Sequence, residues 1–138
     1  MPVINSQALE AAQLARDPYN HVLVPGVITK DALDAANADF PVIDRPGSFP
    51  TGQLKYGPGF AALVDALEGP ELAAALGAKL GIELTGKPTM VTVRGRARQT
   101  DGQIHTDSSG KLVTVLLYMN PSWEESGGQL RLLRSPTD

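Results

Sequence analysis

The run His105-Thr106-Asp107 has side chains and spacing that could bind a metal ion. In an extended strand, residues i and i+2 point to the same side, so the imidazole and the carboxylate would enter one cavity. One imidazole nitrogen and one carboxylate oxygen are two of the three ligands in a facial triad of two histidines and one carboxylate. That triad leaves positions open on iron. The alternative interpretation of His105 is a histidine of a turn or of the core.

A second set of candidate residues lies in the apolar, β-branched run from Lys111 to Met119, which predicts a strand. Thr114, Leu116 and Tyr118 are spaced by two and would share one face of that strand. A tyrosine on an inward face needs a partner for its hydroxyl, and a carboxylate would serve. The alternatives are a tyrosine bonded to the backbone and, for Thr114, an ordinary strand-forming threonine.

The C-terminal part of the sequence carries further short runs in a fixed order. H-T-D at 105–107 is followed by V-T-V-L-L-Y-M-N at 113–120, P-S-W at 121–123 and G-G-Q-L-R-L at 127–132. In order and spacing, residues 94–133 resemble the prolyl 4-hydroxylase-like branch of the iron(II)/2-oxoglutarate-dependent dioxygenases. The residues before position 80 resemble the helical segment that precedes the core in that family only loosely.

This resemblance implies an oxygenase that hydroxylates a C–H bond of a prolyl, peptide or small-molecule substrate and releases succinate and CO2. It implies His105 and Asp107 as iron(II) ligands, with Tyr118 and Thr114 in the pocket for 2-oxoglutarate. The co-substrates would be 2-oxoglutarate and O2, and ascorbate is compatible as a further cofactor. No catalytic residue is implied beyond the metal ligands.

The sequence departs from the family pattern after residue 133. The family has a second histidine ligand and a basic residue for 2-oxoglutarate further downstream, whereas the only histidines here are His21 and His105. His21 lies before the expected core and is interpreted as structural. We therefore expect a truncated chain that is incomplete and inactive alone, or one completed by a dimer partner or another polypeptide. The alternative function is a non-catalytic jelly-roll binding module.

The pattern of the whole sequence predicts one domain over residues 1–138. Residues 1–81 would form a helical segment with one strand, and residues 82–138 the first half of a double-stranded β-helix, or jelly roll. The expected class is thus α+β with a mainly β core whose sheet is unfinished at the C-terminus. The predicted helices cover residues 6–15, 30–38, 60–68 and 70–81, and the predicted strands cover residues 21–28, 89–98, 111–119 and 127–133.

Composition excludes several other classes of protein. The formal net charge is −3 at pH 7, and no basic run marks a nucleic-acid partner. The sequence has no cysteine, which excludes disulfides, thiolate metal sites and a cysteine nucleophile. It has neither an N-terminal signal pattern nor an apolar stretch of the roughly 20 residues that a membrane span needs. These features predict a cytoplasmic protein without a membrane partner.

Overall fold

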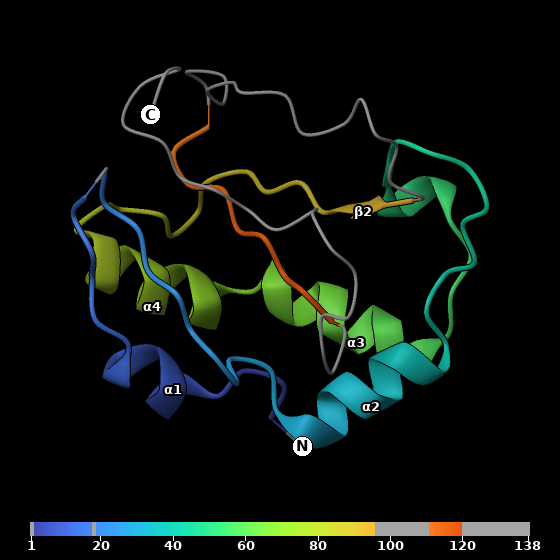
Figure 1. Ribbon diagram of the computed structural model, residues 1–138, viewed down its shortest axis with the longest axis horizontal. Helices are drawn as coiled ribbons and strands as arrows, with labels where there is room; N and C mark the ends of the chain where they lie inside the picture. The colour runs from blue at the N-terminus through green and yellow to red at the C-terminus, as the bar shows by residue number, and fades with distance from the viewer. Residues whose placement is uncertain (1, 18, 96–110, 120–138) are drawn as a thin grey trace.

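The computed structural model describes residues 2–17, 19–95 and 111–119. In this part of the chain four α-helices surround a small core, and one two-stranded sheet lies at the edge (Figure 1). The elements are α1 (Ser6–Ala11), α2 (Lys30–Ala38), β1 (Ser48–Pro50), the 3-10 helix η1 (Thr51–Gln53), α3 (Pro58–Leu67), α4 (Pro70–Leu80) and β2 (Thr92–Arg94).

Local signals in the sequence account for the ends of the helices. The predicted bounds of the second helix are confirmed in α2, which follows Thr29 at the N-cap position. The Thr29 hydroxyl does not cap this helix but donates a hydrogen bond to the carbonyl oxygen of Pro2, at 2.8 Å. Helix α4 begins at Pro70, where a missing N–H costs nothing. It ends at Gly81, whose φ of +72° is a left-handed conformation that favours glycine.

Helices α2 and α3 form the tightest pair in the described structure. Asp39, directly after α2, accepts hydrogen bonds from the backbone N–H groups of Gly59 and Phe60 in the first turn of α3. Gly59 lies against the carbonyl oxygen of Ala35, where a Cβ atom would clash. The carboxylate and the glycine thus hold the two helices at short range.

The core lies between these two helices and the N-terminal segment. Phe60 and Leu63 of α3 and Ala36 of α2 are almost completely buried, and Leu9 brings α1 into the same cluster. Phe60 also makes edge-to-face ring contacts with Phe40 and Tyr56, with ring centroids 5.1 and 4.9 Å apart. The other buried hydrophobic residues are Ile4, Ile28, Ala32, Val64, Leu72 and Val93.

The predicted jelly-roll core is wrong for the described part of the chain, which is mostly helical. Its one sheet pairs β1 and β2 antiparallel, with Phe49 opposite Val93. The predicted strand at 89–98 is assigned only over Thr92–Arg94. Residues 111–119 carry no assigned strand, and residues 21–28 form only isolated bridges at His21 and Ile28. The predicted strand at 127–133 lies outside the described residues.

The physical reason is that strand-forming residues report a preference for an extended, half-buried surface rather than the presence of a pairing partner. In residues 111–119, Leu117 and Met119 pack against the core cluster without pairing to another strand. At residues 21–28, Pro25 and Gly26 interrupt the extended run, and Gly26 has a φ of +72°. The helical predictions were closer to the structure. Helix α3 begins at Pro58, two residues before its predicted start, and α1 ends at Ala11, four residues before its predicted end.

Candidate functional site

The structure places half of the predicted site residues. His105 and Asp107, the expected metal ligands, lie outside the described residues, as do Trp123 and the glycine pair at 127–128. Thr114 and Tyr118, the expected 2-oxoglutarate residues, lie inside them. Of the candidate site, the structure therefore describes only the residues expected to contact 2-oxoglutarate.

Both residues belong to the segment 111–119, which is shown in orange in Figure 1. In that view the segment ends over α3. Leu117 and Met119 are partly buried and pack against the core cluster. Leu116 and Tyr118 alternate with them and are 55% and 52% exposed. Exposure therefore alternates at the end of the segment, and Tyr118 lies on the face directed away from the core. The expected inward orientation of Tyr118 is wrong, because Leu117 and Met119 occupy the core side.

Thr114 is also exposed, as expected for a residue on the same face as Leu116 and Tyr118. The alternation is weaker at this end, because Val115 is 53% exposed as well. Leu112 adds a further exposed apolar side chain, at 55%. The segment thus presents a hydroxyl, a phenol and several apolar side chains on its open side.

A side chain of α2 contacts the end of this segment. The Asn37 amide donates a hydrogen bond to the backbone carbonyl oxygen of Met119, with 3.3 Å between nitrogen and oxygen. The two residues are 82 positions apart in the sequence. Sequence reasoning did not single out Asn37, because a polar residue on an exposed helix face gives no local signal of such a distant contact.

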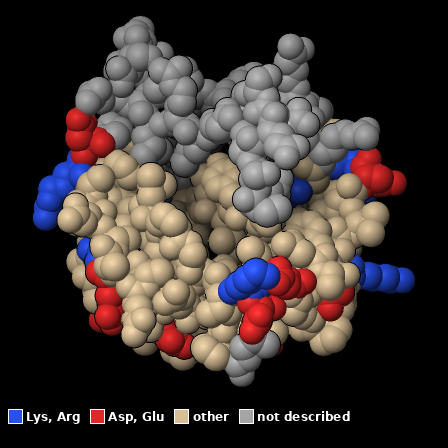
Figure 2. Space-filling view, turned by 60° about the horizontal axis from the view of Figure 1, so that its bottom comes forward, with Lys and Arg blue, Asp and Glu red and all other residues tan. Residues whose placement is uncertain are grey.

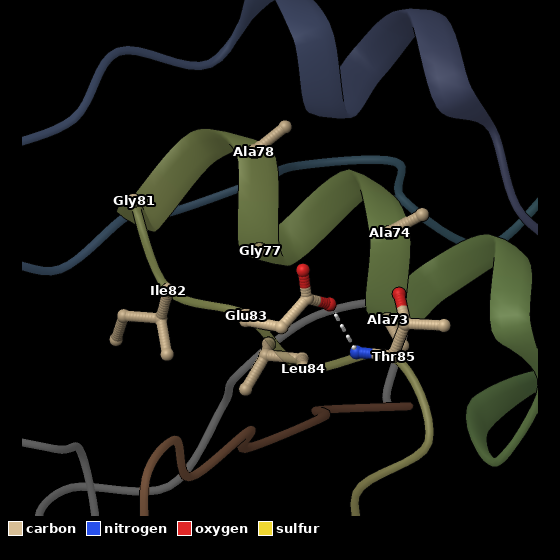
Figure 3. A pocket seen from close by; sticks show the side chains of 9 residues that line it. All are labelled: Ala73, Ala74, Gly77, Ala78, Gly81, Ile82, Glu83, Leu84 and Thr85. Carbon is tan, nitrogen blue, oxygen red and sulfur yellow. Dashed lines mark hydrogen bonds between the residues drawn. The ribbon is translucent and has the colours of Figure 1, made fainter.

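Figure 3 shows a recess between α4 and the loop that follows it. The small residues Ala73, Ala74, Gly77 and Ala78 form its floor. Its one ionisable side chain is Glu83, whose carboxylate accepts a hydrogen bond from the backbone N–H of Thr85 at 3.0 Å. The recess thus offers one carboxylate and no acid–base pair, and it does not resemble a catalytic site.

Electrostatics in the described residues do not mark a second site. No buried residue there is polar or charged, and acidic and basic side chains are interspersed on the face that Figure 2 shows. A hydrogen bond and the charge of Asp34 raise the pKa of Lys30, but this pair lies on the solvent-exposed surface of α2. Within residues 2–17, 19–95 and 111–119, no three His, Asp or Glu side chains are grouped to hold a metal ion.

Comparison with known proteins leaves the family open. No protein-family model, no curated protein and no solved structure matches this chain. Among the described helices, none is long and apolar enough to cross a membrane.

Proposed function

We propose that the chain belongs to an iron(II)- and 2-oxoglutarate-dependent oxygenase that hydroxylates a C–H bond of its substrate. The observation that carries this proposal is the ordered run from His105 through Tyr118 and Trp123 to the glycine pair at 127–128. The proposal does not depend on the jelly-roll architecture, which the described residues do not have.

The chemistry of the donor set fits iron(II). His105 and Asp107 would supply one nitrogen and one oxygen ligand, the mixture typical of non-haem iron sites with open positions. His105 and Asp107 would hold iron(II), which when bound would supply the activation of O2; overall, the substrate C–H, O2 and 2-oxoglutarate would give the alcohol, succinate and CO2. The protein would supply the geometry that orients the reactants.

The 2-oxoglutarate role falls to Tyr118 and Thr114. Tyr118 would donate its hydroxyl hydrogen to the distal carboxylate of the co-substrate, a hydrogen bond strengthened by the charge of its acceptor. The exposed face that Tyr118 shares with Thr114 supports this role, because a side chain turned into the core could not meet a ligand. The apolar neighbours Leu116 and Leu112 would shield the same carboxylate from water.

The substrate class covers prolyl or peptidyl groups and small molecules. A third ligand and a basic partner for 2-oxoglutarate would come from outside this sequence, through a continuation of the chain, a second copy or another polypeptide. Activity that appears only on mixing with such a partner would be consistent with the proposal.

The experiment that tests the proposed function is succinate formation from 2-oxoglutarate with iron(II) and O2, without a prime substrate. The protein, alone or with its completing partner, should release succinate, whereas His105→Ala and Asp107→Ala should not. Asp101→Ala is the matched control, since it removes a nearby carboxylate outside the H-x-D run. Succinate formation at the wild-type rate in either ligand variant would refute the assignment.

A further inference from the structure

Asn37 of α2 contacts the backbone directly beside Tyr118. Its amide nitrogen lies 3.3 Å from the carbonyl oxygen of Met119, the residue that follows Tyr118. We propose that Asn37 is a positioning residue for 2-oxoglutarate: it fixes the register of residues 111–119 on the helices and so directs Tyr118 outward. This inference rests on the proposed function.

Both apolar packing and a hydrogen bond hold residues 111–119 on the rest of the molecule. Leu117 and Met119 pack against the core cluster, and such apolar burial is favourable but not directional. In an extended chain, a shift by one residue moves every side chain to the opposite face. Because Leu116 and Tyr118 also have largely apolar side chains, a one-residue shift would bury them in place of Leu117 and Met119, and Tyr118 would then turn toward the helices. A directional contact to the backbone favours one register over the other.

The hydrogen bond from Asn37 is such a directional contact. Its acceptor is one backbone oxygen, so its geometry is lost when the segment slides by one residue. Among the described residues, it ties a helix side chain directly to the backbone next to Tyr118.

The donor also stands on a rigid part of the molecule. Ala36, the residue before Asn37, is 0% exposed, and the carbonyl oxygen of Ala35 lies against Gly59 of α3. The backbone of α2 is thus fixed at this point by close packing against the neighbouring helix. A polar side chain supported in this way can hold a partner more exactly than a side chain on a loop can.

Two substitutions at Asn37 separate this role from a general effect on α2. Asn37→Asp keeps the shape of the side chain but replaces the donor with a carboxylate oxygen, which repels the Met119 carbonyl. Asn37→Ala removes the donor without adding repulsion and should have the smaller effect. Asp34→Ala is the matched control, because it changes a polar residue of the same exposed helix surface whose hydrogen bond goes to Lys30 instead. Both alanine variants also gain helix propensity. Faster hydrogen exchange or a higher KM in Asn37→Ala, but not in Asp34→Ala, therefore cannot come from a weaker α2 helix.

The experiment measures amide hydrogen exchange over residues 111–119 and, in the same preparations, 2-oxoglutarate turnover by the protein with any partner it needs. We expect Asn37→Asp to speed exchange in this segment about fivefold, the factor that one hydrogen bond typically contributes. The KM for 2-oxoglutarate should rise by a similar factor, with kcat within twofold, because Tyr118 would hold the far carboxylate and not the reacting atoms. Asp34→Ala should change neither quantity.

The possible failures are distinguishable. Wild-type exchange rates in Asn37→Asp would show that the contact to Met119 does not hold the segment. Faster exchange with an unchanged KM would refute the positioning role while leaving the contact intact. Absence of turnover in the wild-type protein would refute the proposed function and its dependent role for Asn37, and the exchange data would still confirm or refute the contact itself.

Discussion

Asp39 stabilises the start of α3 through two hydrogen bonds, and its removal gives a sharp test of the fold. Its two carboxylate oxygens accept from the backbone N–H groups of Gly59 and Phe60, at 2.8 and 2.7 Å. These donors belong to the first turn of α3, where no intrahelical partner exists for them. A carboxylate there also interacts favourably with the positive end of the helix dipole.

The magnitude follows from these contacts. Loss of a side-chain cap typically costs about 1 kcal/mol, within a range of about 0.5–2 kcal/mol, and loss of the charge at the helix N-terminus adds about 0.3–1 kcal/mol. Asp39→Ala should therefore lower the free energy of unfolding by about 1–3 kcal/mol. Asp39→Asn keeps one oxygen acceptor but loses the charge, and it should cost about half as much.

The assay is urea unfolding of both variants, followed by circular dichroism, with unchanged m-values as the sign that the comparison is valid. Asp34→Ala is the control, because this aspartate sits on an exposed face of α2 and its ion pair with Lys30 is 62–86% exposed at the side chains. It should change the unfolding midpoint far less than Asp39→Ala does. Equal midpoints for Asp39→Ala and the wild type would refute the account of how α2 and α3 are joined.

Three further substitutions, with Gly52→Ala as a control for one of them, test other contacts. Lys79→Met should lower the free energy of unfolding by about 1 kcal/mol in urea titrations, because the Lys79 ammonium donates to two carbonyl oxygens at the end of α1, at 2.9 and 2.7 Å; an unchanged midpoint would contradict this. Gly59→Ala should destabilise by about 1–3 kcal/mol, since its Cβ meets a backbone oxygen that cannot rotate away. Gly52→Ala has open space around its Cβ and should not destabilise, so thermal unfolding that ranks the two glycines in reverse would refute the packing argument. Tyr118→Phe should raise the KM for 2-oxoglutarate about tenfold, in keeping with loss of a hydrogen bond to a charged group, and an unchanged KM would exclude the proposed role of the hydroxyl.

Sequence predicted the helices well where punctuation residues fix their ends. Pro70 can begin a helix but not continue one, and Gly81 adopts a left-handed conformation that stops it, so both ends of α4 could be predicted. Asp39 could not be identified in the same way. Its hydrogen-bond partners lie 20 and 21 residues downstream, so nothing near it in the sequence reveals that it caps a different helix.

Sequence predicted the β half poorly because strand pairing depends on distant partners. The apolar, β-branched run at 111–119 predicted a strand with Tyr118 on an inward face, but these residues carry no assigned strand and Tyr118 is 52% exposed. An assigned strand requires a ladder with another strand, whereas Leu117 and Met119 of this run pack against the core cluster instead. The positions of the predicted ligands His105 and Asp107 lie outside the described residues, so the metal site stays a prediction.

Anaerobic titration with iron(II) and 2-oxoglutarate tests the proposed function most directly. The protein, with any partner that completes it, should develop the visible metal-to-ligand charge-transfer band of 2-oxoglutarate chelated to iron(II). His105→Ala should abolish this band, whereas His21→Ala, which removes the other histidine, should leave it unchanged. A folded wild-type protein without the band, or a His105→Ala variant that retains it at full intensity, would contradict the assignment of this chain as an iron(II)- and 2-oxoglutarate-dependent oxygenase.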